Sequence, residues 1–262
     1  MLDVGCGTGD RSILVAKHYG VSELIGIDAC RNSLKIASQV AEEEKFDSFK
    51  TIHGNLFDLP FENESFDVVV SWGVLHHTEN PFEGLKEMHR VCKKEGFIGF
   101  FVYNSYADWR HNLQRQDVLK NGGRSIDQRI TYAINKYSKV PKSKLDQIQI
   151  SRIYDQYVHP YKSDHTLSEI SSWLNDLSIE YSGSFPPLEF KKLINYIKDR
   201  ASMNKKSPVR SFWGKLIIQI SSFLPYFKRV KAKNSKINRF IWQIFFIFQG
   251  ARGQYSNGIA LG

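Results

Sequence analysis

The chain opens on a glycine-rich turn, which constrains its fold more than any other stretch. Leu2–Val4 predict the end of a buried parallel strand, and Asp10–Lys17 predict the helix that follows. Between them, the segment Gly5–Gly9 has glycine at every second position. Glycine lacks a Cβ, so a backbone of this kind can run close beneath a ligand. Strand, glycine turn and helix together are how doubly wound α/β folds bind nucleotides at the carboxyl ends of their strands.

The spacing of the glycines indicates which nucleotide is bound. A dinucleotide fold has the pattern G-x-G-x-x-G, whereas here Asp3 precedes a G-x-G-x-G run by two residues. This pattern resembles the first motif of the class I S-adenosylmethionine-dependent methyltransferases (methyltransferase type 11), which include the ubiquinone/menaquinone-type enzymes. The resemblance implies S-adenosyl-L-methionine as cofactor, with the loop along its methionine half. A generic turn is the alternative for the loop taken alone, and the spacing disfavours a nicotinamide-dependent dehydrogenase.

A second acid supports the nucleotide reading. Leu24–Ile27 predict a short strand that ends at Asp28, and the distance from the glycine loop, roughly twenty residues, fits a strand–helix–strand unit. An acid at this place can accept hydrogen bonds from both ribose hydroxyls. The family has an acid here for that role, and Ala29 is expected to line the same site. A helix cap or a solvated loop acid is the alternative for Asp28.

The stretch Gly54–Pro81 carries the second part of the resemblance. Its matching segments are Leu59-Pro60-Phe61, Ser65-Phe66-Asp67, Val68-Val69-Val70 and His76-His77. It departs from the family at Asn55, where an acid usually receives the adenine amino group. An asparagine oxygen still accepts from an amine but without charge assistance, so we expect weaker binding rather than none. Leu56 would present its backbone N–H to the adenine, and a simple turn role for Asn55 is the alternative.

Three further residues stand where the fourth strand meets the ligand edge of the sheet. Ser71 and Trp72 end that strand. Trp72 either flanks the methionine portion of the cofactor or shapes the acceptor pocket. Packing in the core is the alternative. The resemblance places His76 near the cofactor, although structural packing is the stronger reading of the His76–His77 pair. The complete set of predicted cofactor residues is Asp3, Gly5, Cys6, Gly7, Gly9, Asp28, Ala29, Asn55, Leu56, Ser71, Trp72 and His76.

The resemblance loosens after Asn104, where acceptor specificity is expected. Residues 108–158 are polar and mostly helical, and we expect them to form a lid over the acceptor pocket. A tyrosine- and histidine-rich segment follows, and similar segments of related enzymes face the acceptor. His159, Tyr161 and His165 are therefore the candidate catalytic residues that supply a general base. A position beside a helix cap is the alternative for His165, because Thr166 begins a capping box.

Charge is spread unevenly along the chain. The net charge is +9, yet residues 191–252 hold 15 Lys/Arg against one acid, which leaves a mildly acidic remainder. Within this insertion, residues 208–250 combine apolar, aromatic faces with lysines, which suits an anionic membrane surface. Packing of those faces on the core is the alternative, and nucleic-acid binding is the least favoured reading. No apolar stretch reaches the ~20 residues of a transmembrane helix.

The overall composition is typical of a globular protein, and we expect an enzyme of the cytoplasm. The basic insertion adds the expectation of peripheral attachment to the cytoplasmic face of the membrane. Cysteines occur at positions 6, 30 and 92, without the spacing of disulfides or metal ligands, so no metal is expected. The chain begins directly in a strand that normally has residues ahead of it, and we therefore expect a fragment lacking its N-terminus. The oligomeric state is left open.

Together these observations predict an α/β, Rossmann-like doubly wound fold. Its mostly parallel seven-stranded sheet has helices on both faces, and its last strand is antiparallel by resemblance. Residues 1–103 form the cofactor-binding core, and 104–163 the lid. Strands six and seven, Ile179–Phe185 and Ser256–Leu261, lie in 164–190 and 253–262, and the basic insertion is 191–252. The predicted function is methyl transfer from S-adenosyl-L-methionine to an O, C or N nucleophile of a small-molecule or lipid-linked acceptor. The alternative is a protein that binds this cofactor without turnover.

Overall fold

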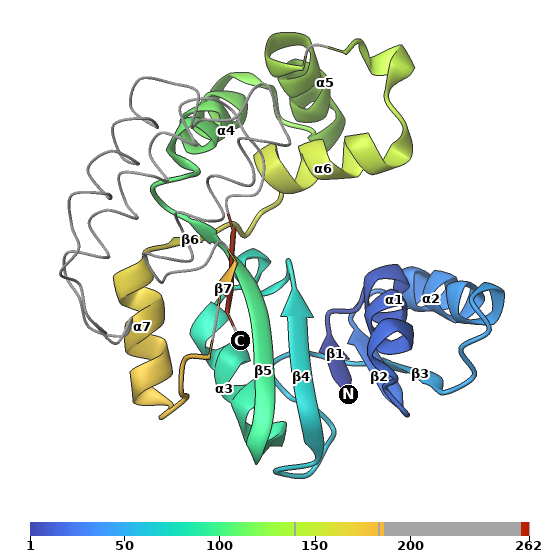
Figure 1. Cartoon of the computed structure of the whole chain (residues 1–262). Coiled ribbons are helices and arrows are strands. Elements are labelled where there is room, and N and C mark those ends of the chain that lie inside the picture. The colour runs from blue at the N-terminus through green and yellow to red at the C-terminus, as the bar shows by residue number, and fades with distance from the viewer. Residues whose placement is uncertain (139, 183, 186–257, 262) are drawn as a thin grey trace, which may run out of the picture. The chain divides into compact units, whose positions relative to one another are not determined.

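A computed structural model describes residues 1–138, 140–182, 184–185 and 258–261 of the chain (Figure 1). The chain divides into two compact units. The first unit contains Met1–Val102, Ser172–Gly183 and Ile259–Gly262, and the second contains Tyr103–Ser171 and Ser184–Gly258. The predicted basic insertion, residues 191–252, and its membrane-facing part, residues 208–250, lie outside the described residues. No described helix is long and apolar enough to cross a membrane.

The first unit is built on a parallel sheet. Its strands are β1 (Leu2–Val4), β2 (Leu24–Asp28), β3 (Phe49–His53), β4 (Phe66–Trp72) and β5 (Cys92–Asn104). They lie in the order β3-β2-β1-β4-β5, and every neighbouring pair among them is parallel. The chain therefore winds outward from β1 in one direction and from β4 in the other. The carboxyl ends of β1 and β4 form the switch point where doubly wound sheets bind ligands.

Helices connect these strands, including the helix predicted after the glycine turn. They are α1 (Asp10–Tyr19), α2 (Arg31–Glu43) and α3 (Pro81–Val91), with a short 3-10 turn, η1 (Leu75–His77), before α3. One face of α2 is buried through Leu34, Ala37 and Ala41. The helix α3 begins at Asn80, whose side chain accepts a hydrogen bond from Glu83 N, with proline at the first helical positions. The predicted doubly wound class is confirmed.

Two details of the sheet differ from the prediction. In the first unit β5 is followed by β8 (Gly258–Leu261), so this unit has six strands, β3-β2-β1-β4-β5-β8. The strand predicted over Ile179–Phe185 is wrong for most of its length, since only β7 (Ser184–Phe185) is extended. The reason is that the preceding helix α7 (Leu167–Asp176) ends in a tight turn: Ser178 has φ +54° and Ile179 N donates to Leu174 O. The backbone of 177–179 is used by the helix end and not by the sheet.

The second unit is mainly helical. Its elements are α4 (Trp109–Asn121), α5 (Ile126–Tyr137), η2 (Lys142–Lys144), α6 (Gln147–Tyr157) and the short strand β6 (Asp164–His165). Val118, Ile130, Ala133, Ile134, Tyr157 and Val158 form its buried cluster. Capping boxes begin α5 at Ser125 and α6 at Asp146. The last residues of β5 belong to this unit and pair in parallel with β6.

Candidate functional site

The glycine loop lies between β1 and α1, and all of its glycines use backbone conformations that other residues avoid. Gly5, Gly7 and Gly9 have φ angles of 76°, 55° and 71°. The amides of Gly5 and Cys6 both donate to Ile27 O, at 2.7 Å and 3.1 Å. These two bonds attach the loop to the end of β2. The alternating glycines are therefore required by the turn itself.

Open space lies above part of this loop. A Cβ placed on Gly7 would meet no atom within 4 Å, and the same holds for Gly73 at the end of β4. A Cβ on Gly5 would instead lie 2.4 Å from Val74 Cγ2. Gly5 therefore permits close packing inside the protein, while Gly7 leaves backbone accessible from outside. A surface of this kind can cradle the extended part of a ligand.

Asp28 stands beside the loop at the carboxyl end of β2. Its Oδ2 accepts a hydrogen bond from Gly7 N at 2.8 Å, and its Oδ1 accepts one from Cys30 N at 2.7 Å. The residue is partly exposed. Because a carboxylate has about four acceptor positions, both oxygens can still receive further donors such as the hydroxyls of a diol. Ala29 next to it is exposed, and its carbonyl oxygen lies 3.1 Å from His53 Nε2.

Asp3 is buried beneath the loop, with 3% of its surface exposed. Ser12 Oγ donates to its Oδ2, whereas Oδ1 has no hydrogen-bond partner among the described residues. Burial raises the pKa of Asp3 from its ordinary value of 3.8 to about 6. Burial likewise raises the pKa of the Cys6 thiol to about 12, so this loop cysteine stays protonated. Asp3 therefore lies under the loop and not on its open face.

Asn55 and Leu56 begin the loop after β3. Asn55 is exposed, and its Oδ1 accepts a hydrogen bond from Phe57 N at 3.1 Å, which is the geometry of an Asx turn. This is the turn role named above as the alternative. The side-chain oxygen keeps a second acceptor position. Leu56 is partly buried, and its side chain packs against Gly84 of α3. The adenine contacts of both residues stay predictions.

The residues at the end of β4 are mainly buried. Ser71 is fully buried, and its Oγ donates to Val4 O at 2.9 Å, which joins β4 to β1. His76 in η1 is 1% exposed, and its Nδ1 lies 3.2 Å from Phe101 O. Trp72 Nε1 is buried without a hydrogen-bond partner among the described residues. An unpaired buried N–H costs about 1–3 kcal/mol, so a ligand oxygen at this place would be stabilised.

The candidate catalytic residues all lie in the second unit, where they fall into two groups. His159 Nδ1 lies 2.6 Å from Tyr161 O and 3.2 Å from Tyr161 N, so these two residues form a local turn. Tyr161 is 50% exposed. His165 is buried and contacts Ser163 and Glu169 instead.

Sequence reasoning missed a buried ion cluster in this unit. Lys162 Nζ donates to Asp108 Oδ2, to Asn112 Oδ1 at 2.8 Å and to Asp164 Oδ1 at 2.9 Å. The Lys162 side chain is 1% exposed, and its Nζ lies 5.0 Å from the centre of the Tyr103 ring. These residues come from the two ends of the segment 103–164. Only their polarity within an otherwise helical segment could have drawn attention to them.

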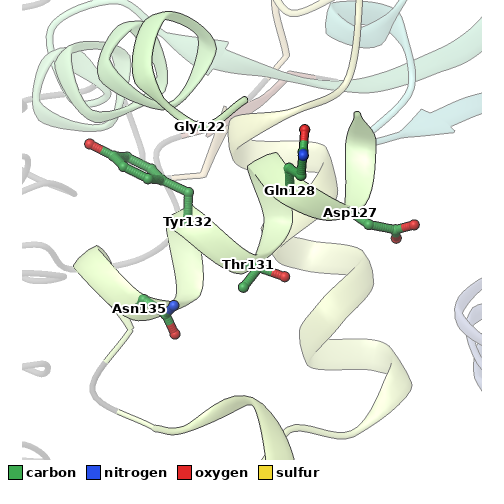
Figure 2. A pocket seen from close by; sticks show the side chains of 6 residues that line it. All are labelled: Gly122, Asp127, Gln128, Thr131, Tyr132 and Asn135. Carbon is green, nitrogen blue, oxygen red and sulfur yellow. The ribbon is translucent and has the colours of Figure 1, made fainter. Parts of the chain in front are cut away.

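The described residues contain neither a metal site nor a second ligand pocket with converging polar groups. No group of three or more His, Cys, Asp or Glu side chains lies close enough together to hold a metal ion within the described ranges. A hollow of about 420 Å³ lies along α5 (Figure 2). Its lining side chains point in different directions around the helix, as Asp127 and Tyr132 show. Gln128 Oε1 already accepts from Arg124 N and Ser125 N, so the hollow offers few convergent polar groups.

Comparison with known proteins agrees with the geometry of the first unit. Residues 2–100 match the family model described as a methyltransferase domain. The demethylmenaquinone methyltransferase of Oceanobacillus iheyensis is 38% identical over 98 residues, covering 37% of this chain and 41% of that protein. The Bacillus subtilis enzyme of the same name is also 38% identical over 98 residues, covering 37% and 42%. The chain thus spans less than half the length of these curated relatives.

Solved structures share the fold over a larger part of the chain. PKMT2 from Rickettsia typhi has a TM-score of 0.57 at 14% identity, covering 85% of this chain and 45% of that one. The same protein in complex with AdoHcy gives 0.56 at 16% identity, covering 85% and 46%. At such identity the likeness shows the fold alone. Residues 2–100 thus resemble a methyltransferase domain in sequence, and the fold is one that PKMT2 shares.

The residues present fit the cofactor of this class. Gly7 leaves open backbone where the methionine half of S-adenosyl-L-methionine would lie, because a Cβ there meets nothing within 4 Å. The Asp28 carboxylate stands next to it with acceptor capacity for a ribose. The cradle and the carboxylate are joined by a hydrogen bond, so their spacing is fixed before a ligand binds.

Proposed function

We propose that the chain transfers the methyl group of S-adenosyl-L-methionine to a nucleophilic O, C or N atom of a small-molecule or lipid-linked acceptor. One observation supports this proposal above the others: the open glycine cradle is joined to the Asp28 carboxylate by the bond from Gly7 N. This combination provides for the methionine and ribose parts of one ligand. The similarity to demethylmenaquinone methyltransferases adds a lipid quinone as the first acceptor to test.

The cofactor would be held by residues of the first unit. The loop from Gly5 to Gly9 would follow its methionine half, Asp28 with Ala29 would bind the ribose, and Asn55 with Leu56 would meet the adenine. Asp3 supports the loop from below, and Ser71 fixes the end of β4. Trp72 and His76 would border the methionine end. The cofactor supplies an activated methyl group on a sulfonium, so the chain has chiefly to orient it and the acceptor in line.

The second unit would supply the base for acceptors that must lose a proton. His159, Tyr161 and His165 are the residues predicted for this role. Of these, His165 is hydrogen-bonded to Ser163 through one nitrogen and to Glu169 through the other. Residues 104–163 would act as the lid that excludes water from the acceptor.

Binding and turnover test this function separately. Isothermal titration with S-adenosylhomocysteine measures the cofactor site, and transfer of labelled methyl to a reduced demethylmenaquinone measures activity. We expect binding together with turnover on one acceptor class. Binding without turnover on quinol, phenol, amine and lipid-linked acceptors would favour the alternative, a protein that binds the cofactor without catalysis. Binding of NAD in place of S-adenosylhomocysteine would contradict the cofactor proposal.

A second proposal concerns the membrane. We propose that residues 208–250 attach the enzyme to the cytoplasmic face of an anionic membrane, where a lipid-linked acceptor resides. The support is the sequence of this segment, which mixes aromatic residues with lysines and arginines and has no acid. Co-sedimentation with anionic liposomes tests it. Absence of binding even at low salt would contradict it, and nucleic-acid binding would appear as a shift on a duplex probe.

A further inference from the structure

The indole N–H of Trp72 is a buried donor at the ligand edge of the first unit. Trp72 is the last residue of β4, and its side chain is partly exposed although Nε1 itself is buried. Nε1 has no hydrogen-bond partner among the residues that the structure describes. An indole N–H only donates, and a buried tryptophan usually has a partner for it. The unpaired donor therefore points to a ligand atom that carries a lone pair.

Packing on β5 holds the Trp72 ring. The strands β4 and β5 lie side by side, and Trp72 pairs with Phe101 (Figure 1). Trp72 projects from the same face of the sheet as Val70, because side chains alternate along a strand. Its Cη2 atom lies 3.5 Å from the position that a Cβ on Gly99 would take. The six-membered ring thus lies over β5, while the five-membered ring that bears the N–H is attached to the carboxyl end of β4, where ligands of such sheets bind.

The residues after Trp72 connect it to the glycine loop. Gly73 has φ 82°, and a Cβ there would meet no atom within 4 Å, so open space lies directly beyond Trp72. Val74 packs so closely on Gly5 that a Cβ at Gly5 would overlap its methyl groups. The tryptophan therefore stands beside the proposed cofactor cradle, and all of these residues belong to the first unit.

The order of the strands indicates which ligand oxygen the N–H meets. The strand β1 lies between β2 and β4, so Asp28 and Trp72 flank the glycine loop from opposite sides. A cofactor with its ribose on Asp28 has its sulfonium and its methionine end beyond the ribose, toward β4. The Trp72 ring lies over β5, on the side of β4 away from β1, and so leans away from the loop. This direction favours an oxygen of the second substrate over the cofactor carboxylate.

We propose that Trp72 is a specificity-determining residue that donates a hydrogen bond from Nε1 to an oxygen atom of the methyl acceptor. This inference rests on the methyl-transfer function proposed above. A donor-only N–H pairs with a hydroxyl, carbonyl or phenolate oxygen, whereas an aromatic amine offers it no free lone pair. A ligand without the oxygen leaves the buried donor unpaired, and such sites discriminate strongly against it. The acceptor class is thereby narrowed to compounds with an oxygen at or beside the methylated atom, such as phenols and quinols.

Probe binding to the full chain saturated with S-adenosylhomocysteine tests the contact without turnover. The probes are naphthol and naphthylamine with the substituent at the same ring position. The wild type should bind naphthol roughly tenfold more tightly than naphthylamine, because only the hydroxyl accepts the N–H. Trp72→Phe keeps an aromatic ring without the donor, so it should bind the two probes equally. Equal affinity of the wild type for both probes would overturn the proposal, and so would binding of neither.

The matched control is Trp173→Phe, which removes an indole N–H from α7. Its ring can still pack on Phe82, since the two ring centres lie 5.8 Å apart. This variant should keep the wild-type preference for naphthol. Loss of the preference in Trp173→Phe as well as in Trp72→Phe would overturn the assignment to Trp72.

Proton NMR of the tryptophan ring N–H groups in the wild type gives a readout that does not depend on the stability of a variant. One of these signals should move downfield when naphthol is added to the complex with S-adenosylhomocysteine, and naphthylamine should leave it in place. Absence of any such shift with naphthol would overturn the proposal.

Titration with S-adenosylhomocysteine alone separates the acceptor from the cofactor as the source of the oxygen. We expect Trp72→Phe to bind it with wild-type affinity. A loss of roughly tenfold or more would overturn the proposal and assign the N–H to the cofactor carboxylate. A wild type that prefers naphthol in this complex but transfers no methyl group to a reduced demethylmenaquinone or to any other acceptor class would instead contradict the proposed function, while the hydrogen bond from Trp72 would stand.

Discussion

Asp28 and Gly7 are joined by a hydrogen bond of 2.8 Å between the carboxylate of one and the backbone N–H of the other. The second carboxylate oxygen accepts from Cys30 N, so both oxygens face donors. An asparagine would turn its NH2 group toward one of these N–H groups and repel it. We expect Asp28→Asn to weaken S-adenosylhomocysteine binding by about 1.5–3 kcal/mol, the usual contribution of hydrogen bonds to a charged group. Isothermal titration measures this loss.

The control for this variant is Asp47→Asn, which removes a charge from an exposed residue that lies outside the predicted site. It should bind as the wild type does. Urea unfolding of both variants shows whether each is folded. Equal affinity of Asp28→Asn and Asp47→Asn would contradict the ribose role.

Alanine substitution at the loop glycines should lower stability at Gly5 and cofactor affinity at Gly7. Gly5→Ala brings a Cβ to 2.4 Å from Val74, so it should destabilise the fold beyond the ~1–2 kcal/mol of left-handed strain. Gly7→Ala meets no atom and should cost only that strain, yet its Cβ fills the cradle and should lower S-adenosylhomocysteine affinity at least tenfold. Unfolding free energy and titration together separate the two effects.

Gly20→Ala is the matched control for Gly7→Ala. Gly20 ends α1 with φ 67°, and a Cβ there also meets nothing within 4 Å. The strain is therefore similar, while the residue lies at the other end of the helix from the loop. Equal affinity in the two variants would mean that Gly7 does not face the cofactor.

The local part of the fold could be predicted because its signals are local. Buried runs such as Leu24–Ile27, the glycine turn and the caps each depend on neighbours within a few residues. The strand expected over Ile179–Phe185 failed because its apolar pattern is also compatible with the end of α7, where Ser178 takes a positive φ. The structure shows that Ile179 N is bonded to Leu174 O in the turn that ends α7, so this N–H is not available to a strand.

The candidate site likewise has a part that the sequence indicated and a part that only the structure shows. Spacing alone indicated that Asp28 ends the strand next to the glycine loop, whereas its bond to Gly7 N is seen only in the structure. The pairing of His165 with Ser163 and Glu169 depends on side-chain rotamers, and the sequence signalled Glu169 only as part of a capping box. The Lys162 cluster joins residues about fifty positions apart along the chain, which no local pattern reports.

Asp117 should control the packing of α4 on α5. It accepts from Tyr137 Oη at 2.6 Å and from Lys136 Nζ at 2.9 Å. These bonds hold the pKa of Asp117 well below its ordinary value, with the Tyr137 hydroxyl as the largest cause. A lowered pKa stabilises the fold above the ordinary carboxyl range, and this stabilisation is lost as the pH falls. Asp117→Asn should therefore lower Tm at neutral pH and speed hydrogen exchange in α5.

A double-mutant cycle checks this assignment. Tyr137→Phe removes the other end of the shortest bond, so the double variant should lose less stability than the sum of the single variants. Additive losses would show that Asp117 and Tyr137 act independently.

Asp3 should make the stability of the first unit depend on pH. Burial raises its pKa from 3.8 to about 6, so the folded protein holds the proton over a range in which the unfolded chain has released it. The contribution of the protonated Asp3 carboxyl to stability is complete below its pKa in the unfolded chain. It is lost as the pH rises through its pKa in the folded protein. The total is about 3 kcal/mol, because each pKa unit corresponds to about 1.4 kcal/mol. Asp3→Asn cannot titrate, so the difference in unfolding free energy between wild type and variant should fall by about 2 kcal/mol from about pH 4.5 to about pH 7. Urea unfolding at both values measures it. A constant difference would show that Asp3 has the same pKa in the folded and unfolded chain, and that its buried carboxyl is compensated by a group other than Ser12.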